Sequence, residues 1–294
     1  MYAVKLNFKS PVHLGEEGLG MEEASLVLHS DTLYCALYSA WQELFTIEGE
    51  LPVRLSSAYP YVENTFYFPK PGLPAPGFED LEKRNLYAKD VKRASFVDLD
   101  TFQSWINGKS IDFERVKESN NQLSKKVNST IRPRVTLDRI TCNSGLYYIG
   151  EVHYDRSCDC GLYYLAEADT ENWGRLQKVM VYLGEVGIGG EKSSGYGRFI
   201  PSFIDNFQPP FAGEGDRYLT LSLLLPGDRD EAKQAYSYRL IRRGGWSMDT
   251  PHLKVHMFTE GSIFSAPVEG KIAIVADVGH PVFRCGRSFL VKVR

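Results

Sequence analysis

The sequence Gly-Ile-Gly-Gly-Glu-Lys-Ser-Ser-Gly-Tyr-Gly-Arg-Phe occupies residues 187–199, and five of these thirteen residues are glycine. Glycine lacks a Cβ and reaches positive φ readily, so such a loop can bring its backbone amides against a flat or anionic ligand. The side chains between the glycines add positive charge, hydroxyl groups and an aromatic ring. This combination is typical of a loop that binds single-stranded nucleic acid.

The loop does not match the two common nucleotide-binding motifs. A Walker loop requires Gly-x-x-x-x-Gly-Lys-Ser/Thr, but Glu191 directly precedes Lys192 in this sequence. A dinucleotide fingerprint leads from a strand into a helix, whereas this loop joins a predicted helix to a predicted strand. We therefore expect no nucleotide and no other cofactor.

The segments around the loop predict an α+β domain. Residues 2–8 alternate between apolar and polar side chains, as a half-buried strand does. An amphipathic helix follows, with Ser30 or Asp31 as its cap. Further along come strands within 51–68, a strand at 146–154, a helix at 170–183 that Gly184 ends, and a strand at 198–204. This βαββαβ order predicts a ferredoxin-like (RRM-like) domain.

The rest of the chain predicts a large insertion and a second domain. The insertion covers about 69–145 and begins with four prolines in nine residues, and its polar part, 120–130, is expected to be mobile. The first domain thus spans 1–207. A linker rich in proline and glycine, 206–216, leads into a second, degenerate ferredoxin-like domain, 208–294. Its predicted strands are 218–225, 235–241, 253–258, 271–278 and 289–293, with a short helix at 228–233.

Positive charge is concentrated locally. The net charge of −3 gives no general attraction for nucleic acid, so a binding surface must come from a local excess of cations. Residues 115–139 contain seven lysines and arginines against two acids. Arg132 and Arg134 flank Pro133 and would project from the same side of an extended strand. The last segment, 281–294, carries four further cations and no acid.

The five cysteines form no regular framework. With no secretory leader and no run of 18 apolar residues, we expect a reduced, cytoplasmic setting. Cys158 and Cys160, with His153 upstream, could supply half of a zinc site. The spacing is not Cys-x-x-Cys and a second pair of ligands is missing, so a surface turn is favoured and no metal is expected.

Five stretches together resemble a known family. The pattern Gly-x-Gly-Gly-x₄-Gly-Tyr-Gly-x-Phe, between the last helix and the last strand of a βαββαβ unit, is similar to the glycine loop of the RAMP superfamily of CRISPR proteins. One branch of that superfamily, the fourth subunits of type III-A (Csm) complexes, resembles the chain over nearly its whole length. The other four stretches are Pro-Val-His-Leu-Gly at 11–15, His-Ser-Asp-Thr-Leu at 29–33, Arg-Val-Thr-Leu-Asp-Arg at 134–139 and His-Pro-Val-Phe-Arg-Cys-Gly at 280–286.

The resemblance implies a non-catalytic RNA-binding scaffold of an antiviral complex. Such a subunit would hold the 5′ repeat-derived tag of the crRNA and join the large polymerase/cyclase-type subunit to the backbone RAMP subunit. Glycine amides, cations and hydroxyl groups would contact phosphates, and Tyr196 would stack on a base. The candidate RNA-binding residues are His13, Arg132, Arg134, Arg139, Gly189, Gly190, Lys192, Ser193, Ser194, Gly195, Tyr196, Arg284 and Arg287, the last two serving either RNA or a subunit interface.

Two other functions stay open. Some RAMP relatives are ribonucleases, and Asp31 with His29 occupies the place of an aspartate with which backbone relatives cut target RNA. Helix capping by Asp31 or Ser30 is the simpler interpretation of the same residues. Alternatively, the chain is a protein-only adaptor whose glycine loop only packs a helix against a sheet.

Overall fold

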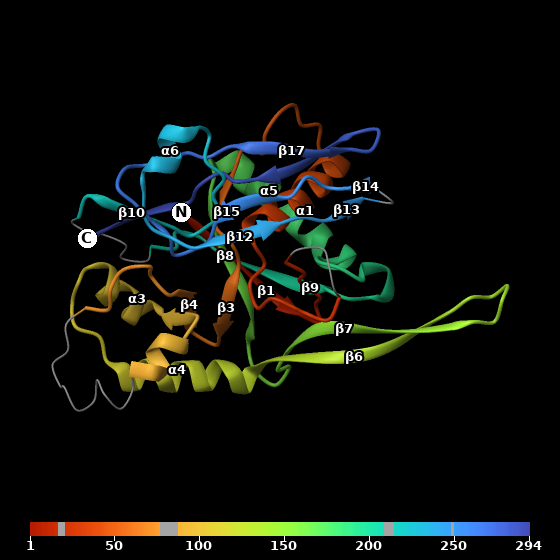
Figure 1. Cartoon of the computed structure of the whole chain (residues 1–294), viewed down its shortest axis with the longest axis horizontal. Coiled ribbons are helices and arrows are strands. Elements are labelled where there is room, and N and C mark those ends of the chain that lie inside the picture. Colours follow the sequence, from red (N-terminus) through yellow and green to blue (C-terminus); the bar gives the residue numbers. More distant parts are fainter. Residues whose placement is uncertain (17–20, 77–87, 209–214, 248–249) are drawn as a thin grey trace.

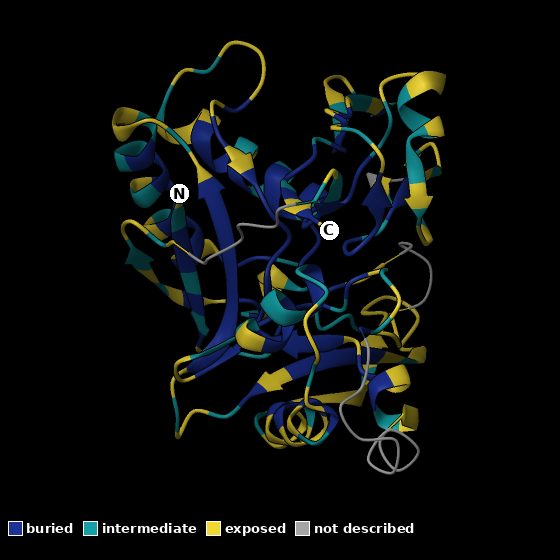
Figure 2. Ribbon diagram, turned by 90° about the vertical axis from the view of Figure 1, so that its left-hand side faces the viewer, coloured by how far each residue is buried: buried dark blue, intermediate teal, exposed yellow. Residues whose placement is uncertain are grey.

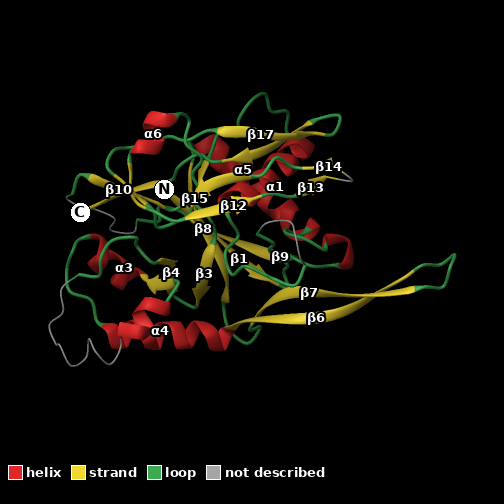
Figure 3. Ribbon diagram, viewed as in Figure 1, coloured by secondary structure: helices red, strands yellow, loops and turns green. Residues whose placement is uncertain are grey.

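A seven-stranded antiparallel sheet lies at the centre of the molecule (Figures 1 and 3). The structure is a computed structural model, and it describes residues 1–16, 21–76, 88–208, 215–247 and 250–294. The strands follow the order β5-β4-β3-β8-β1-β9, and β2 pairs with one end of β8. Their bounds are β1 Tyr2–Phe8, β2 Arg54–Leu55, β3 Tyr59–Val62, β4 Thr65–Pro69, β5 Phe96–Asp98, β8 Cys160–Glu167 and β9 Phe199–Ile204.

Two helices, α1 (Ser30–Leu44) and α5 (Thr170–Val186), pack against each other on this sheet. Their buried stripes include Leu33, Leu37 and Trp41 in α1 and Leu176, Met180 and Leu183 in α5. These are the positions that the 3.6-residue period predicts. Both helices therefore owe their place to the apolar stripe that each one buries against the sheet.

The ends of both helices differ from the prediction. The N-cap of α1 is His29, so capping by Ser30 or Asp31 was wrong. Helix α5 continues through Gly184 to Val186, and Gly187, which has φ +89°, serves as its C-cap. Gly184 is instead a close-packing position, because a Cβ there would lie 2.4 Å from the Phe199 carbonyl oxygen.

The strand predicted at 146–154 exists but does not belong to the central sheet. It is part of β7 (Ser144–Tyr154), which pairs with β6 (Val127–Leu137) in a long hairpin. We call this hairpin the arm; it projects from the body (Figure 1). The place next to β1 is taken by β8, whose seven residues from Cys160 to Ala166 are all buried. A strand buried on both faces has no alternating pattern, and for that reason β8 escaped detection.

The insertion contributes to the main core. Helices α3 (Leu99–Ile106) and α4 (Phe113–Lys126) bury Phe102, Trp105 and Val116 in the same apolar cluster as the central sheet. The segment predicted to be mobile is thus the end of α4 and the start of β6. Residues 77–87, within the predicted insertion, lie outside the described residues.

The C-terminal part forms a second, smaller sheet with the order β11-β16-β10-β19. Leu219, Ile263, Val291 and Val293 of this sheet join the apolar cluster of the N-terminal part, so the two parts share one core (Figure 2). Residues 209–214 of the predicted linker lie outside the described residues. The elements are β10 Arg217–Thr220, α6 Arg229–Lys233, β11 Ala235–Ser237, β12 Leu240–Arg243, β13 Trp246–Ser247, β14 Thr250–Pro251, β15 Val255–Phe258, β16 Ile263–Phe264, β17 Ile272–Asp277, β18 Pro281–Cys285 and β19 Leu290–Val293.

The mixed α/β fold is therefore confirmed. In the described ranges, no helix is both long enough and apolar enough to cross a membrane.

Candidate nucleic-acid interface

The glycine loop is a closed structure built on positive φ angles. It leaves α5 at Gly187, makes one 3₁₀ turn (η1, Lys192–Ser194) and enters β9. The Ile188 amide donates to the Gly197 carbonyl oxygen at 3.0 Å, which closes the base of the loop. Gly197 has φ +71°, and a Cβ there would lie 1.9 Å from the Ile188 carbonyl oxygen. Only glycine fits this position, so the loop sequence dictates the loop shape.

The loop lies against the segment that follows β1. The Gly190 amide donates to the His13 carbonyl oxygen at 2.9 Å, and the Gly197 amide donates to the Pro11 carbonyl oxygen at 2.8 Å. His13 is buried, and its Nδ1 lies 2.8 Å from the Gly150 carbonyl oxygen of β7. His13 therefore joins three elements: the segment after β1, the glycine loop and the arm.

The arm supplies a cation to the loop. Arg134 of β6 donates from its guanidinium to Glu191 at 3.0 Å and to the Ser194 hydroxyl at 3.3 Å. The same guanidinium carbon lies 4.8 Å from the centroid of the Tyr196 ring. The structure thus brings together the two candidate groups that the sequence placed more than fifty residues apart.

The exposed part of the loop consists of Lys192, Ser193, Ser194 and, at its end, Arg198. Tyr196 is only 4% exposed and lies under Arg134, so its ring has no open face for a base and the stacking role was wrong. The amides of Gly190 and Gly195 are bonded within the chain, to the carbonyl oxygens of His13 and Lys192. What the loop presents to solvent is charge and hydroxyl groups.

A groove of about 320 Å³ separates this loop from α1. His13, Gly189, Gly190 and Lys192 line it on the side of the loop. The facing wall belongs to α1 and its N-terminus, and one residue of the C-terminal part also reaches the groove: His29, Thr32, Cys35, Ser39 and Arg243. The groove therefore has a cationic rim at Lys192, and four of the thirteen candidate residues line it.

The other two arginines of the arm lie at different distances from the loop. Strand alternation places Arg132 on the same face as Arg134, and its side chain is 62% exposed. Arg139 lies in the turn between β6 and β7, at the tip of the arm (Figure 1). Arg132 therefore extends the cationic surface of the loop, whereas the structure does not bring Arg139 to the loop.

Arg284 is not available at a surface. It is 8% exposed, and its guanidinium donates to Asp31 Oδ2 at 2.9 Å and to the Gly244 carbonyl oxygen at 2.8 Å. Arg243, also buried, donates to the same Asp31 oxygen at 2.9 Å. Burial alone would raise the pKa of Asp31, but these two guanidinium groups hold the pKa well below its usual range. Direct RNA binding by Arg284 was therefore wrong.

The second residue of the ribonuclease hypothesis, His29, is also paired inside the protein. Its Nδ1 lies 2.7 Å from Glu260 Oε1, and the Ser57 hydroxyl donates to the same oxygen. Burial alone would lower the pKa of His29, but the adjacent Glu260 carboxylate raises it. The carboxylate of Asp31 is fully buried, so neither its charge nor its oxygens reach the groove.

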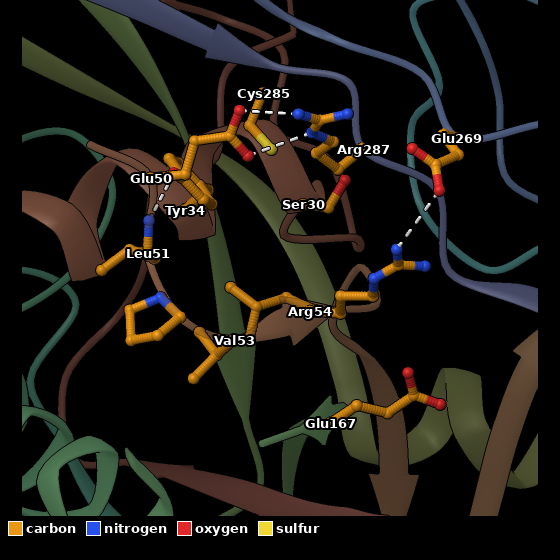
Figure 4. Close-up of a pocket in the computed structure, with 12 residues that line it drawn as sticks. Ser30, Tyr34, Glu50, Leu51, Val53, Arg54, Glu167, Glu269, Cys285 and Arg287 are labelled. Carbon is orange, nitrogen blue, oxygen red and sulfur yellow. Dashed lines mark hydrogen bonds and ion pairs between the residues drawn. The ribbon is translucent and has the colours of Figure 1, made fainter. Parts of the chain in front are cut away.

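Arg287 lines a different cavity, of about 500 Å³, whose other walls come from the start of α1 and the segment 50–55. It makes a bidentate pair with Glu50, at 3.1 and 2.6 Å (Figure 4). A second pair, Arg54 with Glu269 at 3.8 Å, lies in the same cavity. None of the glycine-loop residues lines it, so the structure does not bring Arg287 to the candidate interface at the glycine loop.

Sequence reasoning missed Arg243 and Glu191. Arg243 lies in a short stretch, Leu240–Arg243, whose charges look like those of any solvated strand. Glu191 adopts positive φ, +59°, and its carboxylate orients Arg134. An acid inside a predicted anion-binding loop is an anomaly, and it was the one local signal for this pairing.

Comparison with known proteins first concerns the fold. Solved chains with a similar fold include chains of two Csm subcomplexes. The fold is similar to that of a chain in the crystal structure of a Csm3-Csm4 subcomplex of the type III-A interference complex, with a TM-score of 0.69, 18% identity and full coverage of both chains. A chain in the Csm1-Csm4 cassette in complex with pppApA has a TM-score of 0.67, 23% identity and coverage of 100% and 97%.

The particular family follows from sequence. Residues 213–293 match the family model of the CRISPR Csm4 C-terminal domain. The chain is 29% identical over 288 residues to the CRISPR system Cms protein Csm4 of Thermococcus onnurineus, covering 90% of this chain and 91% of the relative. It is 25% identical to Csm4 of Mycobacterium tuberculosis strain H37Rv, covering 96% and 94%. The predicted resemblance to the Csm4 family is confirmed by these matches.

Proposed function

We propose that this protein is a non-catalytic crRNA-binding scaffold subunit of a type III-A CRISPR effector complex, holding the 5′ repeat-derived tag. The observation that carries the proposal is the meeting of three motif segments at the glycine loop. The glycine loop, the segment after β1 and Arg134 of the arm are connected by hydrogen bonds there. Cations and hydroxyl groups line the exposed edge of that assembly.

The chemistry of the groove suits a single-stranded RNA backbone. Lys192, Ser193 and Ser194 are exposed and can each contact a phosphate oxygen, and Arg132 continues this surface along the arm. The fixed loop supports these contacts, because most of its amides, including those of Ile188, Gly190, Gly195 and Gly197, are already paired within the chain. Tyr196 serves as a buried support beneath Arg134 in place of a stacking platform.

Partner subunits are the second part of the proposal. Relatives occur in Csm1-Csm4 and Csm3-Csm4 assemblies, and we assign the equivalent large subunit and backbone RAMP subunit to this protein. The arm has a bare apolar face opposite its cationic face, which supports a protein contact. The exposed residues on that apolar face are Ile131, Val135, Leu137, Leu146 and Tyr148.

The strand orders support a ferredoxin-like origin for both sheets. In chain order, the strands β1, β3, β8 and β9 are arranged as 4-1-3-2 across the first sheet. The strands β10, β11, β16 and β19 are arranged in the same way across the second. The second unit would be degenerate, because its first crossover holds only the five-residue α6 and its second holds the β17-β18 ribbon.

A ribonuclease function has less support. The hypothesis required Asp31 and His29 at the phosphate, and both side chains are buried in ion pairs. A general acid or base must come within hydrogen-bond reach of the group it serves. Hydrolysis of RNA by the purified chain, lost on Asp31→Asn without unfolding, would reverse this choice.

The test is filter binding of the full chain to tag RNA at several salt concentrations. For a single strand, each phosphate contact contributes about −0.7 to the slope of log K plotted against the logarithm of the salt concentration. The affinity of the chain for tag RNA should therefore fall as salt is raised. Lys192→Ala combined with Arg134→Ala should weaken binding and flatten the slope by about two contacts. Lys178→Ala, which removes an exposed cation on α5, is the matched control and should change neither. A flat response of the wild-type chain would favour the protein-only adaptor.

A further inference from the structure

A buried carboxylate at the base of the arm contacts an exposed arginine and an exposed histidine side chain. Glu151 of β7 is 1% exposed. His153 Nε2 lies 3.1 Å from its Oε2, and Arg132 Nε lies 3.7 Å from its Oε1. The histidine and arginine side chains are themselves 44% and 62% exposed. The buried Glu151 carboxylate is thus in contact with two side chains that are exposed to solvent.

This arrangement is costly for the fold. Neither oxygen of Glu151 has a hydrogen-bond partner among the described residues. Burying a carboxylate without hydrogen bonds is among the most unfavourable things a protein can do. An apolar side chain at this position would avoid that cost. The carboxylate therefore needs a reason beyond packing, and its two neighbours, Arg132 and His153, supply one.

The geometry continues the surface of the glycine loop. In the register of the arm, Arg132 pairs with Ile149, Arg134 with Tyr147 and Asn128 with His153. These pairs all lie on one face of the hairpin, since alternate residues of a strand share a face. Arg134, Arg132 and His153 therefore form a row that leads from the glycine loop toward the body of the protein.

We propose that Glu151 is a positioning residue that holds Arg132 and His153 toward a phosphate of the bound RNA strand, beside the phosphates contacted at the glycine loop. The inference rests on the proposed function, because it extends the same RNA track. Arg132 supplies the permanent charge and His153 a second donor. Glu151 touches no RNA, and it acts by fixing the directions of its two neighbours.

The sign of one substitution separates this role from a simple charge effect. Glu151→Gln removes a negative charge close to the RNA track. If Glu151 acted only through long-range electrostatics, the variant would bind RNA more tightly. If Glu151 positions Arg132 and His153, the variant binds several-fold more weakly, and its salt slope falls by about one contact. The two mechanisms predict opposite outcomes.

The experiment uses the full chain and tag RNA, with affinity measured against salt. Glu48→Gln, which removes an exposed acid on the loop after α1, is the matched control and should leave binding and slope unchanged. Glu151→Asp keeps the charge and should restore part of the slope. A thermal melt accompanies each variant. Arg132→Gln and His153→Gln alter exposed side chains, so they carry the test if Glu151→Gln does not fold, and each should weaken binding.

The outcomes are distinguishable. If the wild-type chain shows no salt-dependent RNA binding, the proposed function fails and this inference fails with it. If the wild type binds normally while Glu151→Gln and Arg132→Gln match it in affinity and slope, only the inference is overturned. Tighter binding by Glu151→Gln would overturn it as well.

Discussion

The sharpest stability prediction concerns Asp31. It is the shared acceptor of Arg243 and Arg284, and together they connect the start of α1 to the C-terminal part of the chain. Asp31→Ala removes the only carboxylate in contact with these two guanidinium groups among the described residues. The side chains of Arg243 and Arg284 are 3% and 10% exposed, so water cannot replace the lost partner without opening the structure.

The magnitude follows from what remains after the substitution. Arg243 keeps hydrogen bonds to the Thr32 hydroxyl and to the carbonyl oxygens of Gly15 and Glu16, whereas Arg284 keeps the Gly244 carbonyl. Two buried positive charges would then face each other without compensation. Breaking a buried ion pair by removing one partner typically costs about 3–5 kcal/mol. At about 2–4 °C per kcal/mol for a large domain, Tm should fall by roughly 6–20 °C.

The assay is urea unfolding followed by circular dichroism, with a thermal melt alongside. The comparison variant is Asp169→Ala: Asp169 caps α5 through the Asn172 amide at 2.8 Å and is solvent-exposed, so its loss should cost only about 1 kcal/mol. A triple variant, Asp31→Leu with Arg243→Met and Arg284→Leu, should recover much of the stability, because apolar replacement of a buried network is often neutral. An Asp31→Ala protein as stable as the Asp169→Ala protein would refute the charge-network account.

Three further predictions follow from the same structure. Because the pKa of Asp31 is depressed in the folded state, the stability that its charge contributes is complete above the unfolded pKa of about 3.8 and is lost as pH falls below it. In urea unfolding between pH 5 and pH 2, the free energy of unfolding should therefore fall less steeply with decreasing pH for Asp31→Asn than for the wild type. An unchanged dependence on pH would contradict this linkage. Because the pKa of His29 is raised in the folded state, the stability that its protonated form contributes is complete below the unfolded pKa of 6.5 and is lost as pH rises through the folded pKa. His29→Gln should abolish this loss of stability at higher pH in the same unfolding series. If the loss persisted, it would belong to another group. Gly197→Ala should destabilise the chain by more than Gly195→Ala in thermal melts. Both glycines have positive φ, but only Gly197 has a carbonyl oxygen 1.9 Å from the position of the new Cβ. Equal effects of about 1 kcal/mol would mean that the backbone strain at positive φ alone sets the cost of both substitutions.

Local pattern predicted the elements that carry their own period. Apolar and polar residues alternate in strand β1, helices α1 and α5 each have an apolar stripe, and the glycine loop is recognisable from its composition. Strand β8 was missed because every residue from Cys160 to Ala166 is buried, which erases the alternation that marks a strand. The sequence prediction assigned β7 of the arm to the central sheet and treated the start of β6 as part of a mobile segment. Its pairing partner lies across a turn, and no local signal distinguishes a paired polar strand from a loop.

The candidate site could be predicted only where a residue's chemistry is used in its own neighbourhood. Lys192, Ser193 and Ser194 are exposed as expected, because the loop holds them outward. Arg284 belongs to an equally cationic stretch, but its partner Asp31 lies 253 residues earlier in the chain. Charge in a sequence shows that a side chain needs compensation, and it does not show whether solvent, RNA or a buried acid supplies it.

The buried ion-pair network around Asp31 and the groove beside the glycine loop share residues. Arg243 binds Asp31 beneath the start of α1 and also lines the groove beside the glycine loop. His29 and Thr32, in the same motif as Asp31, line the groove's other wall. The C-terminal part therefore supplies a charge that fixes the wall facing Lys192. It follows that residues 29–33 and 280–286 help to hold the groove in shape, and that residues 1–207 alone would lack Arg243 and leave the charge of Asp31 without either of its guanidinium partners.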